Sequence, residues 1–64
     1  MTDCYVPVTP AGTACTWLAQ ETEGLAWKAL EADAAHMPYN GIKEFKERGY
    51  RVELIENATP EEFR

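Results

Sequence analysis

Two cysteines and one histidine are the side chains of this 64-residue chain most able to do covalent or metal chemistry. A thiol acts as a nucleophile when a base lies beside it, and a metal needs several ligands at short spacing. Cys4, Cys15 and His36 stand far apart, with no paired ligand spacing among them. We therefore expect no metal, no cofactor and no enzyme activity.

Acidic side chains are abundant, with eleven Asp and Glu against six Lys and Arg and a formal net charge of -5. No pattern brings two carboxylates into a desolvated cleft that would separate their pKa values. The basic residues are interleaved with glutamates, so direct binding to nucleic-acid phosphates is not expected. A basic protein surface is the better electrostatic partner. The alternative that the acidity serves solubility alone stays open.

A β-hairpin is predicted for residues 5–18, with Pro10 and Gly12 in its turn. This turn sets Val8 opposite Ala14 and Tyr5 opposite Trp17. Alternation then assigns one face to Cys4, Val6, Val8, Ala14 and Leu18, and the other to Tyr5, Pro7, Cys15 and Trp17. A two-residue turn would reverse the exposure of Trp17, so the register also stays open.

The two cysteines fall on opposite faces of this hairpin, where a disulfide has poor geometry. We expect free thiols, with Cys4 in the core and Cys15 partly exposed. The first residues are not basic and no apolar run follows, so neither a signal peptide nor a membrane span is predicted. A cytoplasmic protein without membrane contact is the expectation.

Two helices and a third strand follow the hairpin. A helix over residues 22–35 has Thr22 as N-cap and a buried stripe that includes Trp27 and Leu30, and His36 lies in its terminal turn. A second helix over residues 40–48 is capped by Asn40 and ended by Gly49. Residues 50–55 alternate as a strand, and residues 57–64 are predicted to form a loosely ordered acidic tail.

The order ββααβ predicts an α+β fold in a single domain over residues 1–64, with both helices on one face of a three-stranded antiparallel sheet. The opposite face would gather Tyr5, Pro7, Cys15, Trp17, Arg51 and Ile55. Exposed tyrosine and tryptophan are typical of binding surfaces. The alternative is that the N-terminal tail or the acidic tail folds over this face, or that the register slips by one residue.

The short hairpin, the helix that carries Trp27, and the segment Lys46-Glu47-Arg48-Gly49-Tyr50-Arg51-Val52 leading into the last strand also suggest a class of protein. In outline the chain resembles small accessory proteins encoded by phages and prophages. The resemblance implies a compact acidic inhibitor of a host-defence complex, of the anti-CRISPR type. Such an inhibitor would act in the host cytoplasm and occupy a basic or nucleic-acid-facing surface of the complex.

Two functions therefore compete: an inhibitor that binds a host protein, and a homodimeric or accessory structural subunit with no inhibitory role. The candidate partner-binding residues are Tyr5, Trp17, Arg51, Glu53 and Ile55 on the sheet, and Glu31, Asp33 and Glu44 on the helices. The second set would act as an acidic mimic of nucleic acid.

Overall fold

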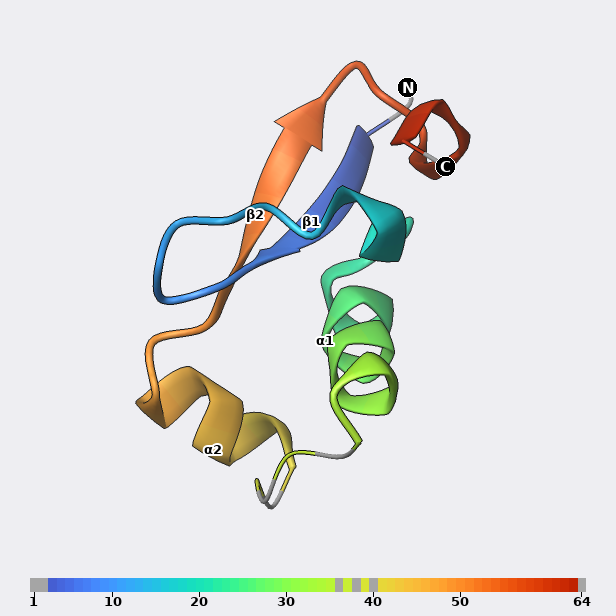
Figure 1. Ribbon diagram of the computed structural model, residues 1–64. Helices are drawn as coiled ribbons and strands as arrows, with labels where there is room; N and C mark the ends of the chain where they lie inside the picture. Colours follow the sequence, from blue (N-terminus) through green and yellow to red (C-terminus); the bar gives the residue numbers. More distant parts are fainter. Residues whose placement is uncertain (1–2, 36, 38, 40, 64) are drawn as a thin grey trace.

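The computed structural model describes residues 3–35, 37, 39 and 41–63. Its elements are strand β1 (Asp3–Val8), 3-10 helix η1 (Thr16–Leu18), helices α1 (Glu23–Asp33) and α2 (Ile42–Glu47), strand β2 (Arg51–Glu56) and 3-10 helix η2 (Pro60–Phe63). Figure 1 shows β1 and β2 side by side, with η1 and α1 on the other side of β1 from β2. The fold is a small α+β arrangement, as expected.

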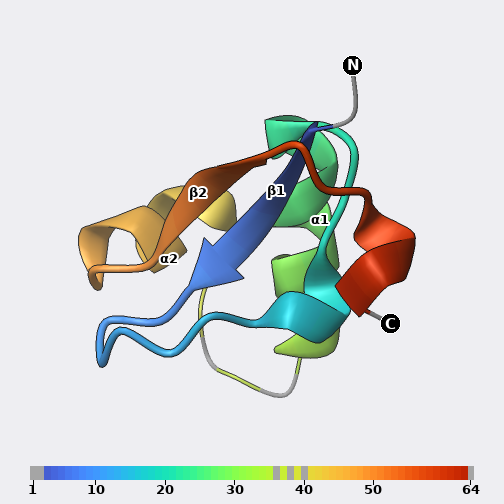
Figure 2. The same ribbon diagram turned by 90° about the horizontal axis from the view of Figure 1, so that it is seen from above.

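The predicted three-stranded sheet is wrong, because the sheet found among the described residues has two strands. β1 pairs antiparallel with β2 over the full length of both strands. On its other edge β1 meets the chain at two isolated bridges, Val8 with Ala14 and Tyr5 with Gln20. Helix η1 occupies the chain between these bridges, where a continuous second strand was expected (Figure 2).

Pro7 gives a physical reason for the interrupted pairing. Tyr5 exchanges two backbone hydrogen bonds with Gln20, at 2.8 and 3.0 Å, and the Pro7 carbonyl accepts from the Cys15 N–H at 2.8 Å. Backbone N–H and C=O groups alternate in direction along a strand. In β1 those of the odd residues point to this edge, and those of the even residues point to β2. Pro7 stands at an odd position and has no N–H to donate. The ladder stops there, and the three residues of η1 shift the register before Gln20.

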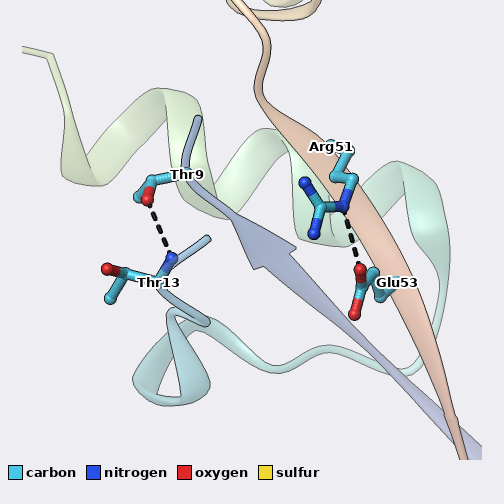
Figure 3. A network of polar contacts seen from close by, with 4 residues as sticks. All are labelled: Thr9, Thr13, Arg51 and Glu53. Atoms are coloured by element: carbon cyan, nitrogen blue, oxygen red, sulfur yellow. Dashed lines mark hydrogen bonds and ion pairs between the residues drawn. The ribbon is translucent and has the colours of Figure 1, made fainter. Parts of the chain in front are cut away.

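The hairpin turn itself is confirmed. The Thr9 N–H donates to the Thr13 carbonyl at 3.0 Å. Figure 3 shows the second bond of the turn, in which the Thr13 N–H donates to Thr9 Oγ1 at 3.1 Å. Gly12 adopts a φ of +89°, which favours glycine. Val8 lies opposite Ala14 as predicted, but the pairing of Tyr5 with Trp17 is wrong.

Two apolar clusters lie on the two faces of the sheet. Residues 14–20, which follow the hairpin turn, are called the hairpin arm. The larger cluster joins this arm and both helices to β2, and contains Cys15, Leu18, Trp27, Leu30 and Phe45 with partly buried Val52. The smaller cluster contains Cys4, Val6, Ala19 and Ala58 with Ile55 and Phe63. Val52 lies opposite Pro7, whereas Ile55 lies opposite Cys4. The helices therefore pack over the face of Pro7 and Val52, and the prediction that they cover Cys4 and Val6 is wrong.

Helix α1 follows its predicted pattern. Thr22 is the N-cap, and its Oγ1 accepts from the Leu25 N–H at 3.2 Å. Ala26, Trp27 and Leu30 form the buried stripe. The predicted place of His36 at the end of this helix lies outside the described residues.

Helix α2 begins at Ile42 with Gly41 in the N-cap position, and the predicted cap Asn40 lies outside the described residues. Gly49 follows the helix with a φ of +99°, which confirms its predicted left-handed conformation. The added Cβ of an alanine at this position would lie 3.3 Å from Pro10 Cβ. The end of α2 is thus packed against the hairpin turn.

The residues after β2 return to the sheet. Asn57 turns with a φ of 59°, and its N–H donates to Asp3 Oδ1 at 3.1 Å. Ala58 is buried and Phe63 packs against the smaller cluster. The stretch predicted as a loose acidic tail thus runs, over residues 57–63, through η2. In the described part of the chain no helix has the length and apolar character to cross a membrane.

Candidate functional site

An apolar hollow of about 230 Å³ opens between the hairpin arm and the end of α1. We call it the Trp17 hollow. It is lined by Thr9, Thr13, Cys15, Trp17, Leu30, Asp33, Ala34, Met37 and Tyr50. Its volume is below the roughly 300 Å³ at which pockets for drug-sized ligands begin, so it suits a single side chain.

Helix η1 presents Trp17 at this hollow. In the short 3-10 turn, Leu18 points into the larger cluster and is 9% exposed, while the neighbouring Trp17 is 55% exposed. Among the large apolar side chains that the structure describes, Trp17 has the greatest exposed fraction, ahead of Leu25 and Leu54. The exposure of Trp17 therefore follows from the interrupted strand pairing and not from a continuous sheet face.

Well-packed residues form the floor and the far wall of the hollow. Leu30, which is 3% exposed, belongs to the larger cluster. The Tyr50 ring meets the Phe45 ring edge to face at 5.2 Å between centroids, and Phe45 meets Tyr39 in the same way at 5.0 Å. These contacts hold the Tyr50 wall in place.

The ionisable groups at the hollow are a thiol and a carboxylate. Cys15 is buried, so its predicted partial exposure is wrong. Burial, and to a lesser extent the negative charge of Asp33, raises the pKa of the Cys15 thiol. Burial also raises the pKa of Cys4, and both cysteines are free as predicted. A protonated thiol is a poor nucleophile. The remaining features of the hollow, its apolar lining and the exposed Asp33 carboxylate, suit binding by apolar contact beside a negative charge.

The predicted site residues of the sheet do not share one aromatic face. Arg51 and Glu53 form an exposed ion pair at 2.9 Å (Figure 3) and lie on the same face as Ile55, which packs against the smaller cluster. Tyr5 is half-buried and pairs with Leu54 on the opposite face. Trp17 stands apart from all of them, on η1.

The predicted acidic residues of the helices are also dispersed. Asp33 lies at the Trp17 hollow, whereas exposed Glu31 lies near Gly41 at the start of α2. Glu44 is half-buried in the first turn of α2. From the whole predicted set, the hollow brings together Trp17 and Asp33.

Tyr50 and Met37 also line the hollow, and the sequence analysis did not place them there. Met37 continues the helical spacing of Leu30 and Ala34, so local periodicity carried a signal for its place beside them. Tyr50 comes from a distant segment, so local periodicity carries no signal for its meeting with the hairpin and α1. Pro7 was the available signal for the exposure of Trp17, since a proline in a strand indicates a break in pairing on one edge.

In the part of the chain that the structure describes, no group of three or more His, Cys, Asp or Glu side chains could hold a metal ion. Comparisons with protein families, with curated proteins and with solved structures give no match to this chain.

Proposed function

We propose that this protein is a small non-enzymatic binding module that holds a partner protein at the Trp17 hollow. The observation that carries the proposal is the Trp17 indole, 55% exposed beside an apolar hollow with a packed floor. Tryptophan is among the residues that dominate binding energy when a partner covers them. Preformed walls reduce the ordering cost of binding.

The ligand that suits this hollow is an arginine or lysine side chain of the partner. Its aliphatic stem would contact Leu30 and Ala34, and its charged head would lie near the Asp33 carboxylate. Trp17 and Tyr50 are the aromatic residues that line the hollow, and aromatic rings attract a cation placed over them. The net charge of -5 favours approach of a basic surface.

An inhibitor of a host-defence complex, of the anti-CRISPR type, is the function that this mode of binding would serve. The resemblance to phage-encoded accessory proteins supports this choice of partner, and the net charge of -5 supports a basic target. The alternative is an accessory subunit that binds through the same hollow and leaves its partner active.

The test begins with capture of the partner from cells of the source organism by the tagged protein, followed by calorimetric titration of the purified partner. We expect Trp17→Ala to weaken binding about 30-fold or more, the effect of losing a hot-spot contact of about 2 kcal/mol. Asp33→Asn should weaken it less, and chiefly at low salt.

Leu25→Ala is the matched control, because Leu25 is also exposed, at 47%, and lies on the first turns of α1 away from the hollow. Its affinity should equal that of the parent. Equal affinity for Trp17→Ala and the parent would overturn the proposed site. An inhibitor abolishes the nucleic-acid binding or nuclease activity of the captured complex, whereas an accessory subunit leaves that activity intact.

A further inference from the structure

We infer that the Trp17 hollow selects arginine over lysine, because a planar guanidinium group fits an apolar hollow with a single carboxylate beside it. The inference rests on the proposed function and deepens it by naming the side chain that the partner inserts. Charge alone does not separate the two side chains, since both carry one positive charge at neutral pH. The difference lies in the shape and hydration of their head groups.

The negative charge at the hollow comes from one side chain. Among the described residues that line the hollow, Asp33 is the only charged one. It is the last residue of α1, it is exposed, and it has no ion-pair partner in the part of the chain that the structure describes. Its charge contributes to the raised pKa of the buried Cys15 thiol, which lines the same hollow. The field of the carboxylate therefore reaches the interior of the hollow.

The other lining residues offer little to a hydrated cation. Leu30 and Ala34 bring apolar atoms to the hollow. Thr9 also lines it, but its Oγ1 already accepts from the Thr13 N–H at 3.1 Å. A cation that enters must therefore give up water on most sides and regain hydrogen bonds chiefly on the side of Asp33.

The two cationic head groups differ in the directions of their donors. An ammonium group is compact and strongly hydrated, and its three N–H donors point in three directions. A guanidinium group is planar and weakly hydrated, with all five N–H donors in its plane and none on its two faces. Its edge would form paired hydrogen bonds with the Asp33 carboxylate while its faces contact apolar side chains. An ammonium group at the same place would turn donors toward apolar atoms, which costs free energy.

Two contacts between cations and aromatic rings elsewhere in the chain show the same difference. The guanidinium carbon of Arg48 lies 4.4 Å from the centroid of the Tyr39 ring. Lys46 Nζ lies farther, 5.2 Å, from the centroid of the Trp27 ring. A planar guanidinium can stack on a ring, which brings more of the group into contact. The two aromatic residues that line the hollow allow such a contact with an arginine of the partner.

An NMR titration of the parent protein with the N-acetyl methylamides of arginine, lysine and citrulline tests the selection, with the Trp17 indole signal as readout. Citrulline keeps the shape of arginine without its charge. We expect the Kd of the arginine probe to be lower than those of the other two by about 5-fold or more. A lysine probe that binds as tightly as arginine would overturn the inference and leave the proposed cation site standing. No shift with any probe, or equal binding of arginine and citrulline, would overturn the proposed function as well.

A charge-removing variant tests the part assigned to the carboxylate. Asp33→Asn should raise the Kd of the arginine probe about 5-fold or more and change that of the citrulline probe less than about 2-fold. Glu47→Gln is the matched control, because Glu47 is also an exposed acidic residue at the last position of a helix and does not line the hollow. It should change the Kd of the arginine probe less than about 2-fold. An equal loss in both variants would show a general effect of net charge and overturn the role of Asp33.

Discussion

The two edges of β1 treat the same short strand in opposite ways. Toward β2 the pairing is regular along the full strand, whereas toward the hairpin arm it consists of two bridges separated by η1. The regular edge exposes side chains that are mostly charged, such as Arg51 and Glu53. The irregular edge exposes Trp17 and forms a hollow beside it. A missing backbone donor at Pro7 can thus leave an apolar hollow beside the strand, because it prevents a second strand from pairing there.

Truncating Leu30, which lines the hollow and belongs to the larger cluster, should have the largest effect on stability. Leu30→Ala removes a 3% exposed side chain that packs in the larger cluster and floors the hollow. We expect the free energy of unfolding to fall by about 2–5 kcal/mol in urea titrations. A loss below about 1 kcal/mol would mean that the hollow collapses around the smaller side chain.

Proline scanning along β2 should separate its inner and outer edges. Glu53→Pro removes an N–H that faces β1, and should lower the free energy of unfolding by about 1–3 kcal/mol more than Glu53→Ala does. Leu54→Pro removes an N–H that faces outward. It should differ little from Leu54→Ala, because an edge strand tolerates a proline whose missing N–H would face solvent. Equal losses at both positions would show that the alternation assigned to β2 is wrong.

Gly49→Ala should weaken the junction where the hairpin turn meets the start of β2. The residue adopts a φ of +99°, and an added Cβ would lie 3.3 Å from Pro10 Cβ. We expect a loss of about 1–2 kcal/mol in the free energy of unfolding. Gly24→Ala is the control: it lies in α1 with no atom within 4 Å of an added Cβ, and should gain about 0.5–1 kcal/mol. Gly49→Ala as stable as the parent would argue against the tight turn.

The smallest effect should come from the two thiols, Cys15 in the larger cluster and Cys4 in the smaller one. Burial raises both pKa values above the ordinary 9.0, so the folded protein favours the neutral thiol. This contribution to stability is fully present below about pH 9 and is lost as pH rises through the raised pKa values. Urea titrations from pH 7 to 10 should show a shallower decline for Cys4→Ala/Cys15→Ala than for the parent. Equal slopes would mean that the folded state leaves thiol ionisation unchanged.

Local patterns in the sequence predicted the elements well. Pro10 and Gly12 set the turn, Thr22 set the start of α1 and Gly49 set the end of α2, because each acts within a few residues of itself. The alternation of Tyr50 to Ile55 likewise located β2, within one residue at each end.

The pairing beyond the turn could not be predicted in the same way. Alternation treats Pro7 as a residue that faces one side, but its effect comes from the N–H that it lacks. The resulting shift at η1 changed the partner of Tyr5 from Trp17 to Gln20. The hollow then depends on Tyr50, which joins it through packing between distant segments.

We propose that the interrupted edge of β1 makes the Trp17 hollow a site for a cationic side chain. The most direct measurement is an NMR titration of the protein with N-acetyl-arginine methylamide, compared with N-acetyl-norleucine methylamide. The Trp17 indole signal and the Met37 methyl signal should shift, more strongly with the arginine probe. The Trp27 indole should not, because it is 6% exposed and its Nε1 donates to Glu23 at 3.3 Å. A Trp17 signal that stays in place with both probes would contradict the account.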